Sequence, residues 1–102
     1  MDTRINEITN YAKIVRERYD LKAIYLYGSL AKGTANEHSD IDVAIVIDPV
    51  NPDEYMSVLS GLFSIAADFE SSIEPNLLVD DGVYNKYSFL AEVIETGKLI
   101  GV

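Results

Sequence analysis

The sequence predicts a small α/β domain built on a mixed β-sheet that is flanked by helices. Segments with the periodicity of an amphipathic helix alternate with short apolar segments, in the order helix, strand, turn, strand, helix, strand, helix. A full helix joins the second strand to the third, which favours a right-handed parallel crossover with the helices on one side of the sheet. The length of 102 residues suits one core, and we expect residues 1–102 to form a single domain.

The first part of the chain predicts a helix, a strand and an extended turn. Apolar residues recur at intervals of three and four between residues 3 and 19, which is the spacing of one helical face. Residues 23–27 (AIYLY) are apolar and aromatic, and Gly28 ends the run, as expected for a buried strand. Residues 28–39 are rich in turn formers, and a short helical turn fits at 29–32.

The second part predicts two more strands and two more helices. Residues 40–47 (DIDVAIVI) form a β-branched run that an Asp-Pro pair ends, and residues 73–79 (IEPNLLV) are expected to form a third strand. Helices are predicted at 52–71 and at 84–96, with Gly97 in the position that follows a helix. The expected inward face of the helix at 52–71 consists of Tyr55, Val58, Leu59, Leu62, Phe63, Ala66 and Phe69.

Charge and composition exclude several classes of function. The net charge is −9, and residues 33–85 contain eleven acidic residues and no Lys or Arg. Nucleic acid backbones bind to Lys and Arg stripes, so we expect no direct nucleic acid binding. No apolar run is long enough to cross a bilayer and no signal peptide precedes the first helix, so we expect a cytoplasmic protein without membrane contact. The absence of cysteine excludes disulfides and thiolate chemistry.

Asp40 and Asp42 are the strongest candidates for chemistry. They are two residues apart at the start of a predicted strand, so both carboxylates project from one face. Two adjacent carboxylates repel each other unless a cation lies between them. Oxygen ligands without His or Cys suit Mg²⁺ or Mn²⁺, and Mg²⁺ usually completes its shell with substrate phosphates. A nucleoside triphosphate would supply those phosphates.

The turn at Gly28-Ser29 complements this pair. Glycine allows the backbone to approach a ligand closely, Ser29 supplies a hydroxyl donor, and the N–H groups of a short helix start can cradle a phosphate. Together the four residues read G-S-x10-D-x-D, a combination expected by chance in roughly one chain in a thousand of this length.

Other polar residues near this motif are given lesser roles. Lys32 fits a phosphate contact and a solvated loop position equally well. His38 is expected to be a spectator, and Ser39 to orient the start of the strand. Tyr25 and Tyr27 are expected in the core or in a cleft wall. Three further acidic residues are expected to be ordinary turn formers: Asp48, Asp80 and Asp81.

The segment YGSLAKGTANEHSDIDVAIVI resembles the signature of the DNA polymerase beta-like nucleotidyltransferase superfamily. More narrowly, nearly the whole chain resembles the minimal nucleotidyltransferase (MNT) domain proteins, including the closing segment FLAEVIETGKLI. The resemblance implies the polymerase beta-like fold and a third carboxylate on the next strand. Glu74 is the candidate, where family members often have Asp.

The resemblance also implies roles for these residues. Asp40, Asp42 and Glu74 are the expected catalytic residues and the ligands of two Mg²⁺ ions, Gly28 and Ser29 are expected to bind the nucleotide, and ATP is the expected substrate.

Small MNT proteins of this type resemble the antitoxin of HEPN/MNT toxin–antitoxin pairs. This resemblance implies transfer of AMP from ATP to a tyrosine hydroxyl of a HEPN-type RNase toxin. Two alternatives stay open at the level of sequence. One is a non-catalytic antitoxin that neutralises its toxin by binding alone, and the other is a nucleotidyltransferase that acts on a small-molecule hydroxyl.

Overall fold

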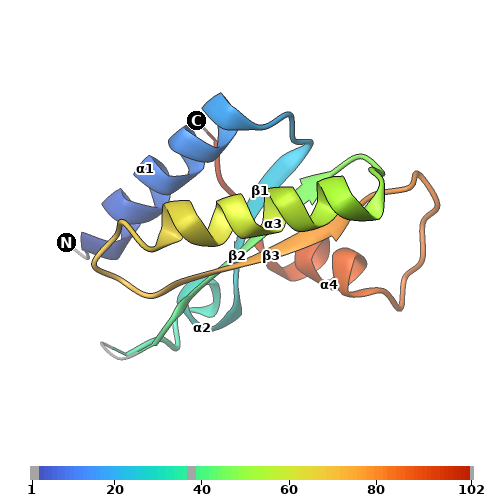
Figure 1. Cartoon of the computed structure of the whole chain (residues 1–102). Coiled ribbons are helices and arrows are strands. Elements are labelled where there is room, and N and C mark those ends of the chain that lie inside the picture. The colour runs from blue at the N-terminus through green and yellow to red at the C-terminus, as the bar shows by residue number, and fades with distance from the viewer. Residues whose placement is uncertain (1–2, 37–38, 102) are drawn as a thin grey trace.

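The structure, a computed structural model, describes residues 3–36 and 39–101 (Figure 1). The predicted order of helices and strands is confirmed, and His38 lies outside the described residues. The elements are α1 (Thr3–Arg18), β1 (Ala23–Tyr27), α2 (Gly28–Lys32), β2 (Ile41–Ile47), α3 (Pro52–Ala66), β3 (Ile73–Val79), α4 (Phe89–Thr96) and β4 (Lys98–Leu99).

The four strands form one mixed sheet in the order β3-β2-β1-β4. The predicted parallel pairing of the second and third strands through a helix is confirmed, because β2 and β3 are parallel and α3 connects them. β1 runs antiparallel to both of its neighbours. β4 was not predicted: the apolar tail pairs Leu99 with Tyr25, and the N–H of Ile100 donates to the carbonyl of Ile24 at 2.8 Å.

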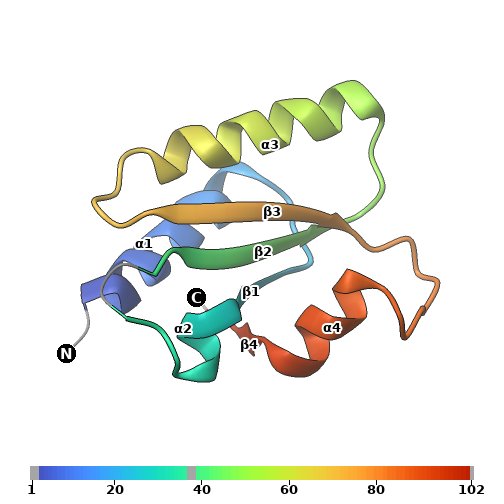
Figure 2. The same ribbon diagram turned by 90° about the horizontal axis from the view of Figure 1, so that it is seen from below.

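Helices cover both faces of the sheet, so the expectation of helices on one side is wrong. α1 and α3 lie on one face, and α4 lies on the other (Figure 2). Side chains along β2 alternate between the two faces of the sheet, so this one strand packs against the helices on both faces. Val43 and Ile45 belong to the main core with α1 and α3, whereas Ala44 and Val46 are buried outside that core. α4 adds its own buried residues, Ala91 and Val93, outside the main core.

α3 ends at Ala66 instead of Ser71, because contacts with α1 turn the chain back toward the core. The ring of Phe69 packs edge-on against that of Tyr11, with centroids 5.9 Å apart. The N–H of Ser71 donates to a carboxylate oxygen of Glu7 at 3.0 Å. These tertiary contacts replace the helical hydrogen bonds that local sequence alone would favour.

The inward face of α3 differs from the prediction at two positions, Phe63 and Ile65. Phe63 is 50% exposed, while Leu62 and Ile65 are buried in the core. The buried stripe is therefore rotated toward Ile65, a residue that the predicted face omitted.

α4 begins at Phe89 instead of Tyr84. The side chain of Ser88 accepts a hydrogen bond from the N–H of Ala91 at 3.0 Å and so caps the helix N-terminus. Gly97 follows the helix as predicted, but its φ of −80° is an extended conformation. Within the ranges that the structure describes, no helix is both long and apolar enough to cross a bilayer.

Candidate active site

Three residues on adjacent strands form one row across the sheet. Tyr27 at the end of β1 is the register partner of Asp42 on β2, and Asp42 is the register partner of Glu74 on β3. Register partners project from the same face of a sheet. Asp40 precedes Asp42 by two residues and lies on the same side. The sheet therefore brings together the three carboxylates that the sequence singled out.

The turn after β1 packs directly against this row. Gly28 has a φ of +74°, and a Cβ atom at this position would collide with the carboxylate of Asp42. Only glycine combines this conformation with this approach. The adjacent Ser29 lies in the first turn of α2, and its carbonyl accepts the N–H of Thr34 at 2.9 Å. The Ser29 hydroxyl makes no hydrogen bond to another residue in the described part of the chain.

Glu74 owes its extended backbone to its position before Pro75 at the open edge of the sheet. The N–H of Ile41 donates to the carbonyl of Ser72, and the N–H of Asp80 donates to the carbonyl of Ile47. In a pair of parallel strands, this pattern of hydrogen bonds means that the backbone N–H and C=O groups of the even-numbered β3 residues point toward β2. Position 75 faces outward, so proline removes no hydrogen bond of the sheet.

The carboxylates repel one another electrostatically. The pKa of Glu74 is raised by the charge of Asp40, then by burial, by the charge of Asp42 and by a hydrogen bond with Asp40. The pKa of Asp42 is raised by burial and then by the charge of Asp40. No Lys or Arg forms an ion pair with these three residues within residues 3–36 and 39–101. A cation from outside the chain would relieve the repulsion.

The donor set suits a hard divalent cation that shares its ligands with a substrate. All three groups offer oxygen, which Mg²⁺ prefers, and Mg²⁺ usually takes one or two carboxylates and completes its shell with phosphates and water. Among the described residues, no three His, Cys, Asp or Glu side chains converge closely enough to hold a metal ion by themselves. The three carboxylates thus offer part of the coordination shell of a cation, and phosphates and water would complete it.

Tyr27, which belongs to the row, and Asn76, which lies beside it, were not among the predicted site residues. The Nδ2 of Asn76 donates a short hydrogen bond to the hydroxyl oxygen of Tyr27. The pKa of Tyr27 is raised by burial and then by the charge of Asp42; the hydrogen bond from Asn76 lowers it, and the charge of Glu74 raises it to a lesser extent. Strand alternation could have placed Asn76 beside Glu74, since the two are two residues apart. The register that brings Tyr27 alongside is not readable from local sequence.

The remaining predicted residues lie around the turn. Lys32 is exposed in the last turn of α2. The Ser39 hydroxyl accepts the N–H of Asn36 at 3.0 Å, a contact that lies before the start of β2.

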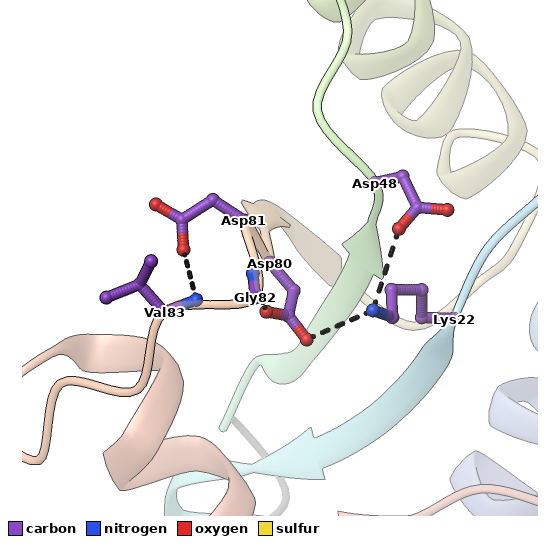
Figure 3. Close-up of polar contacts among 6 residues, drawn as sticks. All are labelled: Lys22, Asp48, Asp80, Asp81, Gly82 and Val83. Atoms are coloured by element: carbon purple, nitrogen blue, oxygen red, sulfur yellow. Dashed lines mark hydrogen bonds and ion pairs between the residues drawn. The ribbon is translucent and has the colours of Figure 1, made fainter.

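A second polar cluster lies at the opposite end of β2 and β3 (Figure 3). Lys22 bridges Asp48 and Asp80, with Nζ to carboxylate oxygen distances of 3.6 and 3.3 Å. Asp80 also accepts the N–H of Gly82, and Asp81 accepts the N–H of Val83, both at 2.9 Å. These contacts fix the strand ends and the following turn, as predicted for turn acids.

Comparison with known proteins gives one family and several relatives. The family described as "Polymerase beta, Nucleotidyltransferase" matches residues 7–101. A candidate protein adenylyltransferase of Methanocaldococcus jannaschii is 30% identical over 89 residues, which cover 83% of this chain and 84% of that protein. The protein adenylyltransferase MntA of Thermococcus cleftensis is 31% identical over 62 residues, which cover 54% of this chain and 63% of that protein.

Among solved structures, a toxin–antitoxin crystal structure with AMP-PNP contains a chain with a similar fold. The TM-score is 0.60 at 26% sequence identity, and the alignment covers 91% of this chain and 72% of the other.

Proposed function

The chain belongs to the polymerase beta nucleotidyltransferase family, and we propose that it is an antitoxin that transfers AMP from ATP to a tyrosine hydroxyl of a HEPN-type RNase toxin. The family match confirms the fold that the sequence predicted, a small mixed sheet flanked by helices. It also identifies the chain as a nucleotidyltransferase. The nucleotide, the metal, the acceptor and the partner belong to the proposal.

The names of the relatives support the transfer of AMP to a protein. Two of them are named as protein adenylyltransferases, and for the one from Methanocaldococcus jannaschii the name marks a candidate assignment. The toxin–antitoxin structure was determined with AMP-PNP, an ATP analogue. These descriptions apply to those proteins, and the similarity of sequence and fold extends them to this chain as a hypothesis.

One observation carries the proposal. Asp40, Asp42 and Glu74 lie on one face of the sheet, and the Gly28-Ser29 turn packs directly against Asp42. A turn suited to an anion, next to three carboxylates that have no cationic partner among the described residues, would only add to the repulsion in the protein alone. The arrangement is coherent for a site that binds a triphosphate together with a divalent cation.

In the proposed reaction, Gly28 and Ser29 bind the triphosphate and hold it in line with the incoming hydroxyl. The phenolic oxygen forms a bond to the α-phosphorus, and the bond from that phosphorus to the oxygen bridging to the β-phosphate breaks. Pyrophosphate leaves with the electron pair of that bond. Glu74 takes up the phenolic proton, a role that its raised pKa favours.

Asp40, Asp42 and Glu74 would hold Mg²⁺, which would neutralise the negative charge that develops on the phosphates during transfer. The chain itself contributes the carboxylates on two neighbouring strands and the glycine that lets the turn approach them. The longer side chain of Glu74 replaces the aspartate that the family resemblance leads one to expect.

The distribution of charge supports a basic partner. Residues 33–85 contain eleven acidic residues and no Lys or Arg, and this stretch includes Asp40, Asp42 and Glu74. An RNase must attract phosphates and therefore carries basic surface near its own site. Complementary charge would steer such a partner toward Asp40, Asp42 and Glu74.

The proposal is tested with a partner that co-purifies with this protein and with ATP labelled at one phosphate at a time. Label from the α-phosphate should become covalently attached to the partner, and label from the γ-phosphate should not. Asp42→Asn should abolish the attachment. Attachment of γ-label would indicate phosphoryl transfer, whereas α-label found only on a small molecule would favour a small-molecule acceptor.

A further inference from the structure

The side chain of Tyr27 reaches across the sheet from β1 to β3. Its hydroxyl accepts the hydrogen bond from Asn76, and β2 lies between the strands that carry these two residues. The residue of β2 that pairs with Asn76 is Ala44, which is fully buried. A larger side chain at that position would stand in the path of the contact. The two residues therefore form a bridge over β2, here called the Tyr27–Asn76 bridge.

A second contact fixes the ring of Tyr27. The ring of Phe89, at the start of α4, packs edge-on against it with centroids 5.4 Å apart and planes inclined at 78°. The hydroxyl is held by β3 and the ring by α4. Two restraints from separate elements leave the phenol little freedom to rotate.

The bridge lies alongside the carboxylates of Asp42 and Glu74. Tyr27 is the register partner of Asp42, and Asn76 follows Glu74 by two residues on the same face. Because the Tyr27 oxygen accepts from Asn76, its own hydrogen remains available to a neighbouring acceptor. Asp42 and Glu74 are the charged groups that act on this hydroxyl.

We propose that Tyr27 and Asn76 are positioning residues, and that their bridge fixes the carboxylates of Asp42 and Glu74 in the orientation that holds the divalent cation. The inference rests on the proposed function, which assigns those carboxylates to the cation. The hydroxyl hydrogen of Tyr27, which the contact with Asn76 leaves available, can be donated to an oxygen of either carboxylate, and this would direct the other oxygen toward the cation. Hydrogen-bond partners of metal ligands typically change metal affinity or activity by about 10–100-fold when they are removed.

The test measures Mn²⁺ binding to the whole chain by electron paramagnetic resonance, so that no acceptor or partner is needed. Tyr27→Phe keeps the ring and its contact with Phe89 but removes the hydroxyl, and we expect it to weaken Mn²⁺ binding about tenfold. Asn76→Leu should weaken binding to a similar extent. The double variant should be no worse than either single one, since the two groups act as a unit.

Tyr25→Phe is the matched control. Tyr25 is on the same strand and face, and its hydroxyl makes no hydrogen bond within the described residues, so its removal should leave Mn²⁺ affinity unchanged. The melting temperature of each variant separates loss of binding from loss of fold. If Asn76→Leu does not fold, Tyr27→Phe alone decides the result.

Three outcomes would overturn the inference. If Tyr27→Phe binds Mn²⁺ as tightly as the wild type while Asp42→Asn does not bind it, the bridge has no role in cation binding and the proposed function is unaffected. An equal loss in Tyr25→Phe would assign the effect to general packing. Unchanged affinity in Asp42→Asn would overturn the proposed metal site, and the role of the bridge with it.

Discussion

Gly28 and Asp42 are so closely packed that a Cβ atom on residue 28 would collide with the carboxylate of residue 42. This contact joins the two halves of the G-S-x10-D-x-D motif, which are separated in sequence by the whole turn. The glycine leaves the space that the carboxylate fills. The motif is therefore a structural unit, in which the turn that would bind phosphate is fitted to a carboxylate that would bind metal.

Gly28→Ala should damage both stability and the site. Its φ of +74° disfavours alanine by about 1 kcal/mol, and the collision with Asp42 should also displace that carboxylate. Gly82→Ala is the control, because Gly82 has a φ of +83° but no atom lies within 4 Å of the place that an alanine methyl would take. Denaturant unfolding should show both variants to be destabilised. Only Gly28→Ala should lose Mn²⁺ binding, and equal binding in the two would refute the role given to this contact.

Ser29→Ala should weaken nucleotide binding without affecting the fold. The Ser29 hydroxyl makes no hydrogen bond within the described residues, so its removal leaves no buried group unpaired. Loss of a hydrogen bond to a charged phosphate should weaken AMP-PNP binding about tenfold. Calorimetric titration measures the affinity, and Ser57→Ala on the exposed side of α3 is the control. A lower melting temperature with unchanged AMP-PNP affinity would make the turn purely structural.

The raised pKa values of Asp42 and Glu74 predict how stability depends on pH. Raised pKa values mean that the folded protein binds protons more tightly than the unfolded chain, so ionisation of these groups costs stability. The cost is absent below their ordinary pKa values of 3.8 and 4.5 and complete above the raised ones.

Asp42→Asn/Glu74→Gln should therefore be more stable than the wild type at neutral pH. This advantage should shrink as the pH falls through the raised pKa values. Thermal melts of both proteins across that range provide the measurement, with metal ions removed by a chelator. An advantage that grows on acidification would contradict the proposed repulsion.

Variants at the opposite end of the sheet should leave the site unaffected. Lys22 pairs with Asp48 and Asp80, and its exposed position limits what the pairs contribute. Lys22→Met should lower the melting temperature slightly at low salt, and the difference should disappear at high salt because exposed charges are screened. AMP-PNP and Mn²⁺ affinities should equal those of the wild type. A loss of Mn²⁺ affinity would show that the two ends of the sheet are coupled.

Much of this architecture could be predicted because local pattern and tertiary structure agree. The strands at 23–27 and 73–79 match the structure at both ends, and the parallel crossover follows from the helix between two strands. Asp40 and Asp42 share a face because strand geometry alone requires it. Glu74 joins them because β3 pairs with β2 in a register that places it beside Asp42.

The differences arise where distant contacts determine the structure. Phe69 leaves the helical path because it packs against Tyr11, more than fifty positions earlier in the chain. The strand at Lys98–Leu99 exists only because β1 offers a free edge. The Tyr27–Asn76 bridge needs the register of three strands at once, which no local segment encodes. Sequence patterns therefore located the carboxylates but not the residues that surround them.

The proposed function predicts that the protein silences its partner by covalent transfer of AMP and not by binding alone. The most direct measurement compares the mass and the RNase activity of a co-purified partner after incubation with ATP and Mg²⁺ and either the wild type or Asp42→Asn. We predict that the wild type adds AMP to the partner and abolishes RNA cleavage, whereas the variant binds the partner, adds nothing and leaves cleavage intact. Equal silencing by both proteins, with no nucleotide attached, would contradict the account and assign the inhibition to binding alone.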